Sequence, residues 1–179
     1  MRLTTNAIAI RDNLMRVLRM TGAEVKVSLH GDPSHHNKMV GVSSFERTKR
    51  NILRLVEAGV RTSVQTTVVA HAEQVVDWMV DFCLETGIRR LSILPFVPRG
   101  NGAHLKDEMD FSSQQRRSLR NHIKKKRHEL NGRIDIRWLD FTVRPILVVD
   151  ADGRVVLEAA TEATDKVLGY IPFDISQMR

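Results

Sequence analysis

Cysteine is almost absent from this sequence, whose 179 residues contain only Cys83. One thiol excludes a disulfide framework. It also excludes a cysteine-rich zinc site and an iron–sulfur cluster held by this chain alone, because such clusters are bound by several cysteine thiolates. Cys83 shares a helical stripe with Val76, Met79 and Val80, so we expect it in the core.

Long hydrophobic runs are also missing. No apolar segment approaches the roughly 18 residues that a membrane span requires, and the first ten residues lack the basic-then-apolar pattern of a signal peptide. Hydrophobic residues make up 42% and charged residues 27%, which is typical of a globular chain. The sequence therefore predicts a cytoplasmic protein with no membrane partner, built as one domain with a small appendage.

Aromatic residues are scarce at 5%, and none lies in the segment that carries the excess charge. Between Arg116 and His128 there are seven Lys or Arg residues and no acid, while the rest of the chain is balanced. The charge is compatible with an acidic partner or nucleic acid. Because no aromatic ring is present to stack bases, a solvated helix face is favoured over nucleic-acid binding.

Strand-like and helix-like segments alternate along most of the chain. Period-two or β-branched patterns predict strands at residues 3–10, 25–30, 61–69, 91–97 and 134–141. Helical spacing predicts helices at residues 14–22, 44–58, 72–85 and 112–130. Ser112 with Gln115 resembles a capping box at the start of the last helix. The segment with His35 and His36 is predicted to be a polar loop, because Gly31-Asp32-Pro33-Ser34 has turn chemistry.

This alternation predicts an α/β fold with a parallel sheet, either doubly wound or a partial (β/α) barrel. From about Thr142 the pattern changes. Residues 145–149 and 154–157 flank Asp150-Ala151-Asp152-Gly153, which is a β-hairpin signal. We therefore expect a (β/α) region over residues 1–141 and a small antiparallel hairpin appendage over residues 142–179.

Ligands of parallel α/β folds bind at the carboxyl ends of the strands. Polar residues predicted at those ends are Ser28, His30, Gln65 and Thr67, with Pro95 to Arg99 after a further strand. Ser28, Gln65 and Thr67 could face a small ligand or could satisfy one another inside a barrel, and position alone leaves both readings open.

Two further groups give weaker signals. Arg99 follows Pro98 and precedes Gly100-Asn101-Gly102, so it could grip a carboxylate or phosphate, but the loop lacks the glycine pattern of a dinucleotide site or a P-loop. His30, His35 and His36 lack a recognised metal-ligand spacing, so solvated loop histidines are favoured and no metal site is predicted. No catalytic residue can be assigned from spacing.

A succession of short motifs resembles a known family. The motifs are Thr4-Thr5-Asn6-Ala7, then residues 25–31, then His36, Gly41 and Phe45, then residues 57–60, then residues 94–102. In this order they are similar to the later part of the core of radical S-adenosylmethionine (radical SAM) enzymes, in the branch with cofactor-maturation and peptide-modifying members. The tail, including residues 150–155 and 168–171, is similar to the hairpin that opens the auxiliary (SPASM-like) C-terminal domain of many relatives.

The resemblance implies an iron–sulfur oxidoreductase in which a 4Fe-4S cluster cleaves S-adenosylmethionine (SAM) reductively to a 5′-deoxyadenosyl radical. It implies that Ser28 and His30 lie near the SAM ribose, Gln65 and Thr67 near the ribose or methionine moiety, and Leu94 to Phe96 beside adenine. The family's three-cysteine cluster motif and its second-strand glycine-rich segment are absent. Leu157 and Glu158 stand where an auxiliary-cluster cysteine would follow the hairpin, so no auxiliary cluster is expected.

The leading hypothesis is therefore a partial radical SAM enzyme that is inactive as an isolated chain. The cluster-bearing strands would be missing through a truncated or mis-started reading frame, through expression of a fragment, or because a second chain of a split enzyme supplies them. The substrate, the reaction and the oligomeric state do not follow from the residues. The alternative is a non-catalytic binding module that uses the basic helix 112–130 on an acidic partner or nucleic acid.

Overall fold

The computed structural model describes residues 2–69, 72–99, 102–103, 111–141, 145–150, 152–159 and 161–171. The chain divides into two compact units. The first unit comprises Met1–Pro95 and Phe111–Leu139, and the second comprises Phe96–Asp110 and Asp140–Arg179.

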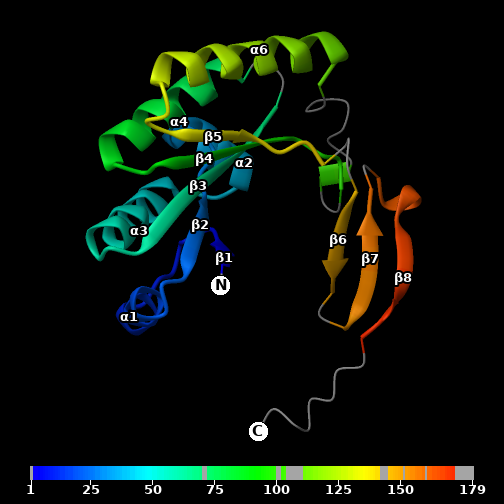
Figure 1. Cartoon of the computed structure of the whole chain (residues 1–179), viewed down its shortest axis with the longest axis horizontal. Coiled ribbons are helices and arrows are strands. Elements are labelled where there is room, and N and C mark those ends of the chain that lie inside the picture. The colour runs from blue at the N-terminus through cyan, green and yellow to red at the C-terminus, as the bar shows by residue number, and fades with distance from the viewer. Residues whose placement is uncertain are drawn as a thin grey trace, which may run out of the picture. The chain divides into compact units, whose positions relative to one another are not determined.

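The first unit is built on a five-stranded, wholly parallel sheet in the order β1-β2-β3-β4-β5 (Figure 1). Its strands follow one another in both sequence and space, as expected for successive right-handed β-α-β units. The strands are β1 (Arg2–Thr5), β2 (Glu24–Ser28), β3 (Arg61–Val68), β4 (Arg90–Pro95) and β5 (Asp135–Trp138).

Helices cover one face of this sheet and bury its apolar side chains. The helices are α1 (Asp12–Met20), α2 (Pro33–Val40), α3 (Phe45–Glu57), α4 (Glu73–Thr86) and α6 (Ser113–Leu130). Val27, Val64 and Ile93 on the strands are fully buried against helix residues such as Ile52 and Met79. This face is the hydrophobic core, because it excludes most of the unit's apolar surface from water.

The other face of the sheet is polar. Side chains alternate between the two faces of a strand. On this face, nearly every side chain of the five strands is polar or charged. From strand to strand they are Arg2 and Thr4; Glu24, Lys26 and Ser28; Arg61, Ser63, Gln65 and Thr67; Arg90, Ser92 and Leu94; and Asp135 and Arg137. We call this surface the open face.

The helix termini follow the signals in the sequence. The Ser112 hydroxyl accepts from the Gln115 amide and the Gln115 side chain accepts from the Ser112 amide, so the predicted capping box is confirmed. Gly87 ends α4 in the left-handed conformation that glycine adopts without steric cost.

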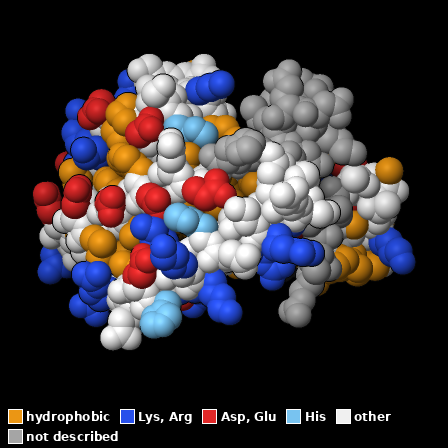
Figure 2. Space-filling model, turned by 90° about the horizontal axis from the view of Figure 1, so that it is seen from above, with side chains coloured by type: hydrophobic (Ala, Val, Ile, Leu, Met, Phe, Trp, Pro, Cys, Tyr) orange, Lys and Arg blue, Asp and Glu red, His pale blue; other side chains and the backbone are white. Residues whose placement is uncertain are grey.

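Figure 2 views the molecule from the α6 side. Lys and Arg side chains are visible on the surface seen in this view, with Asp and Glu side chains among them.

The second unit contains a three-stranded antiparallel sheet in the order β6-β7-β8. The strands are β6 (Ile146–Val149), β7 (Arg154–Glu158) and β8 (Lys166–Tyr170), with a short 3₁₀ helix at Glu162–Thr164. The predicted hairpin is confirmed as β6 and β7, and β8 adds a strand that the turn signals did not reveal.

The predicted α/β fold with parallel strands and an antiparallel C-terminal element is confirmed, but the local prediction around His35 is wrong. Residues 33–40 form the helix α2 rather than a polar loop. Asp32 accepts a hydrogen bond from the His35 amide at 2.9 Å, and Pro33 occupies the first helical turn, where a proline is favourable. The apparent turn is therefore a helix N-terminus. Gly100 and Asn101 of the predicted Arg99 loop lie outside the described residues.

No helix in the described ranges is long and apolar enough to cross a bilayer.

Candidate functional site

Ser28 and Gln65 lie side by side on the open face, Ser28 at the carboxyl end of β2 and Gln65 within β3. They are register partners, and the Gln65 Nε2 donates to the Ser28 Oγ at 3.0 Å. Both residues are partly exposed. Ser28 and Gln65 therefore satisfy one another, which is one of the two alternatives that the sequence left open. Their partial exposure also leaves both side chains accessible to a ligand.

His30 and Thr67 continue the same two chain segments one register step further. The Thr67 amide donates to the His30 Nδ1 at 3.1 Å. A neutral imidazole that accepts at Nδ1 carries its proton on Nε2. Burial, followed by the charges of His36 and His35, lowers the His30 pKa to about 4. At neutral pH this ring is therefore an uncharged Nε2–H donor at the carboxyl edge of the sheet.

A second histidine, His36 on α2, packs against His30 and bonds its backbone. Its Nδ1 accepts from the His30 amide at 3.2 Å, its Nε2 lies 3.1 Å from the Ser44 Oγ, and the two rings stack with centroids 5.7 Å apart. His36 is only 2% exposed. The prediction of solvated loop histidines is therefore wrong. Helix α2 turns the His36 ring into the protein, where Ser44 and the His30 amide bond both nitrogens, and the Nε2 of His35 on the same helix is buried as well.

Ser92 on β4 is the residue that the sequence reasoning missed. It is the register partner of Gln65, is 1% exposed, and its Oγ has no hydrogen-bond partner among the described residues. Buried hydroxyls are normally bonded. A serine inside the apolar run Leu91 to Leu94 carries the same signal that singled out Ser28. Ser28, Gln65 and Ser92 thus form one polar row across three strands.

The two remaining predicted residues have different surroundings. Pro95 ends β4, and its register partner Val68 is buried, so its ring lies on the helix-covered face while Leu94 shares the open face with Thr67. Arg99 belongs to the second unit, where its guanidinium bonds both carboxylate oxygens of Asp165 at 2.9 and 2.6 Å. The Arg99 hydrogen bond holds the pKa of Asp165 at about 2.

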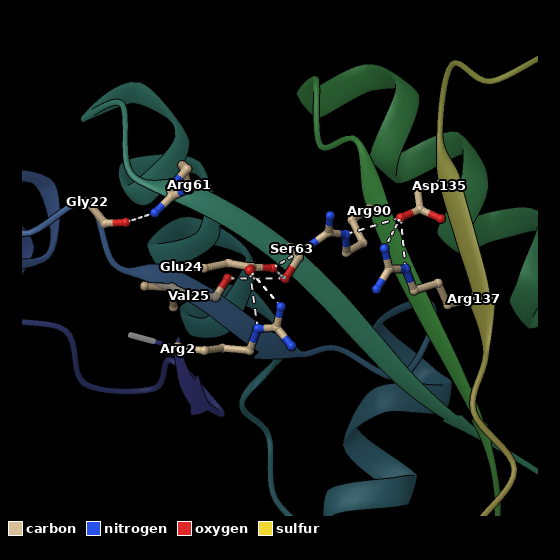
Figure 3. Close-up of polar contacts among 9 residues, drawn as sticks. All are labelled: Arg2, Gly22, Glu24, Val25, Arg61, Ser63, Arg90, Asp135 and Arg137. Carbon is tan, nitrogen blue, oxygen red and sulfur yellow. Dashed lines mark hydrogen bonds and ion pairs between the residues drawn. The ribbon is translucent and has the colours of Figure 1, made fainter.

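Below the polar row, toward the amino ends of the strands, ion pairs cross the open face (Figure 3). Glu24 pairs with Arg2 at 2.9 Å and with Arg90 at 2.8 Å. Asp135 pairs with Arg90 at 3.2 Å and with Arg137 at 2.8 Å. Burial alone would raise the pKa of Glu24, but the hydrogen bonds and charges of Arg2 and Arg90 outweigh it and lower that pKa. These pairs connect β1, β2, β4 and β5.

The residues of this chain do not fit a 4Fe-4S cluster. Its one cysteine, Cys83, is buried on α4, and burial raises the pKa of the thiol to about 12, whereas a cluster ligand must be a thiolate. No three His, Cys, Asp or Glu residues gather as a metal site in the part of the chain that the structure describes.

The polar row and His30, in contrast, do fit an uncharged, polar portion of SAM. Ser28, Gln65 and His30 offer hydroxyl, amide and imidazole donors close together, and the Ser92 hydroxyl on β4 has no hydrogen-bond partner within the part of the chain that the structure describes. Hydroxyl and amide groups of this kind can bond ribose hydroxyls. Groups of this kind can hold and orient a ligand through hydrogen bonds.

No protein-family model matches the sequence. None of the curated proteins matches it either.

Solved structures do match. SuiB of Streptococcus suis bound to S-adenosylmethionine covers 77% of this chain at 17% identity with a TM-score of 0.64. The structure of anSMEcpe with bound AdoMet and the Cp18Cys peptide covers 99% at 16% identity with a TM-score of 0.73. With AdoMet alone, anSMEcpe covers 99% at 17% identity with a TM-score of 0.72. The chain spans 31% of the SuiB chain and 56% of the anSMEcpe chain. Both are radical SAM enzymes, so the chain has a radical SAM-like fold.

Proposed function

We propose that this chain forms the SAM-binding wall of a radical SAM enzyme and contributes no catalytic residue of its own. The observation that carries the proposal is the polar row Ser28, Gln65 and Ser92, which starts at the carboxyl end of β2 and has His30 beside it, in a chain whose fold matches AdoMet-bound enzymes. In that role Ser28 and His30 bond the ribose, and Gln65 and Thr67 bond the ribose or the methionine moiety.

The division of labour follows from the chemistry of the chain. Because its residues do not fit the cluster, the 4Fe-4S centre and the reductive cleavage of SAM belong to strands outside these 179 residues, and the isolated chain binds SAM without cleaving it. Pro95 contributes through the backbone at the end of β4. Arg99 is bonded by Asp165 within the second unit, so the proposed site does not include it. The cytoplasmic location predicted from the composition is part of the same proposal, and the substrate stays open.

Isothermal titration calorimetry of the full chain with SAM tests the binding. We expect saturable binding that Gln65→Ala weakens about tenfold, since one hydrogen bond to a ligand contributes about 1 to 1.5 kcal/mol. Gln114→Ala, at an exposed position of α6, is the matched control and leaves the affinity unchanged. Equal affinity of the Gln65→Ala variant and the wild type, or no binding by the folded chain at millimolar SAM, would overturn the proposal.

Reading the genomic DNA directly upstream of Met1 tests where the cluster ligands come from. An in-frame Cys-x3-Cys-x2-Cys motif supports one continuous radical SAM enzyme. A stop codon or an unrelated gene there contradicts a single continuous chain and leaves the split enzyme or the non-catalytic binding module based on α6.

A further inference from the structure

The cations of α6 are divided between two sides of the helix. On the side that packs against α4, the Lys126 Nζ lies 3.0 Å from the Asp77 Oδ1 and the His122 Nε2 lies 2.8 Å from the same oxygen. Lys125 is 3.8 Å from Glu129 on the same helix. These side chains form ion pairs with acids of the same chain, so they have structural roles and are poor candidates for a binding surface.

On the other side of α6, Lys and Arg side chains surround a shallow hollow of about 540 Å³, and the described residues that line it include no acid. Arg116 also lines the hollow but has an interaction of its own. We call the other four cations the basic stripe: Arg117, Arg120, Lys124 and Arg127. Their spacing of three or four positions puts them along one side of the helix. Arg127 also donates from Nε to the Ile136 carbonyl of β5 at 2.8 Å, which ties this end of the stripe to the sheet edge.

The chain's excess charge resides on this helix. The net charge is +7, and the residues outside the segment 116–128 carry equal numbers of basic and acidic side chains. Leu119, Ile123 and Leu130 bury the inner side of α6, so the stripe is held on a fixed scaffold. An anion that meets it gains several charge-assisted contacts without a cost for ordering the helix.

We propose that the basic stripe binds the phosphate backbone of duplex nucleic acid without reading its sequence. From Arg117 to Arg127 the stripe extends about 15 Å along the helix, and a duplex presents one phosphate charge per about 1.7 Å of its axis. Three of the four stripe residues are arginines, whose planar guanidinium matches phosphate oxygens in pairs. The segment 112–130 has no aromatic residue, which a sequence-tolerant phosphate contact does not require.

This surface is independent of the proposed SAM site. The stripe lies on a helix that covers the apolar face of the sheet, whereas Ser28, Gln65 and Ser92 lie on the open face. Loss of one function by a local substitution therefore leaves the other measurable, and each proposal can fail without the other.

The test is fluorescence anisotropy of the full chain with a labelled 20-base-pair duplex of arbitrary sequence. If the stripe meets about four phosphates, the log–log salt slope is about −4, so that 200 mM NaCl weakens binding roughly 200-fold relative to 50 mM. Arg117→Glu/Arg120→Glu/Lys124→Glu is expected to weaken binding at 50 mM NaCl by roughly 50-fold or more, because three phosphate contacts become repulsive.

The matched control is Arg16→Glu/Arg47→Glu/Arg50→Glu, which makes the same change in net charge at exposed positions of α1 and α3. We expect it to weaken binding less than about fivefold. Circular dichroism and SAM titration show whether each variant retains its fold. Equal losses in the two folded variants would mean that only net charge matters and would refute the stripe. Competition by poly-glutamate as strong as that of unlabelled duplex would identify an acidic protein partner and likewise refute the proposal.

Discussion

His30 is held uncharged by its position between two backbone contacts. Its Nδ1 accepts from the Thr67 amide, its own amide donates to His36, and burial is the largest cause of its low pKa. A protonated ring would lose the Thr67 bond and would place a cation beside the stacked His36. The native fold therefore selects the neutral ring.

This selection makes stability depend on pH. The unfolded histidine binds a proton near pH 6.5 and the folded one near pH 4, so the unfolded state holds more protons between these values. The contribution of His30 to the free energy of unfolding is therefore complete above about pH 6.5 and is lost as the pH falls toward 4. The loss amounts to about 3 kcal/mol, at 1.36 kcal/mol per pKa unit. Urea unfolding from pH 4 to 7 measures it.

Two substitutions separate His30 from other titrating groups. We expect His30→Asn to make the stability profile between pH 4 and 6.5 flatter, with His36 and His35 retaining part of the slope because burial lowers their pKa as well. His128→Asn, at an exposed position of α6, keeps the wild-type slope. A His30→Asn profile as steep as the wild-type profile would contradict the assignment.

At the scale of the element, α2 connects the candidate site to helix capping. Asp32 accepts from the His35 amide at 2.9 Å, and the helix then carries His36 to the end of β2. Asp32→Ala is expected to lower the free energy of unfolding by about 1 kcal/mol and to weaken SAM binding, because His36 loses its fixed position. Urea titration and calorimetry measure the two effects.

Asp32→Asn is the control for this prediction, since an asparagine oxygen also caps a helix. It should retain most of both properties. If Asp32→Asn were as damaging as Asp32→Ala, the side-chain charge and not the cap would be responsible.

The sequence predicted those elements whose signals are local. Period-two and helical spacing identified the five parallel strands and α1, α3, α4 and α6, and the capping box at Ser112 was visible in four residues. It missed α2 because Asp32-Pro33 serves equally well as a turn or as a helix start. It missed β8 because Lys166–Tyr170 contains Gly169 and pairs with β7 only through tertiary contact.

The candidate site was predicted only in part for the same reason. Ser28, Gln65 and Thr67 were found because strand ends are shared in a parallel sheet. Register and side-chain directions produce the Ser28–Gln65 bond, the burial of His36 and a Ser92 hydroxyl that finds no partner in the described ranges. No local pattern encodes them. The ion pair of Arg99 with Asp165 joins residues 66 positions apart.

At the scale of the whole first unit, ion pairs and not apolar contacts connect the strands on the open face. Glu24 bonds Arg2 and Arg90 from two other strands and is 19% exposed. Glu24→Gln keeps the shape and removes the charge, so it should lower the free energy of unfolding by about 1 to 2 kcal/mol, allowing for partial screening by solvent. Urea unfolding measures the difference.

High salt provides an independent check of this ion network. In about 1 M NaCl the screening length falls to about 3 Å, so the gap between wild type and Glu24→Gln should narrow. Glu57→Gln, at an exposed position at the end of α3, should match the wild type at every salt concentration. A Glu24→Gln variant as stable as the wild type at low salt would show that the network contributes nothing to the fold.

Cys83 gives the protein a built-in reporter of its own opening. The thiol is completely buried on α4, and its pKa of about 12 keeps it protonated, so a thiol-reactive dye meets an inert group in the folded chain. The dye reacts once the core opens. Because the chain has no other cysteine, the rate of labelling by the dye reports the opening around Cys83 alone, and it ranks the kinetic lifetimes of all the variants without an engineered cysteine.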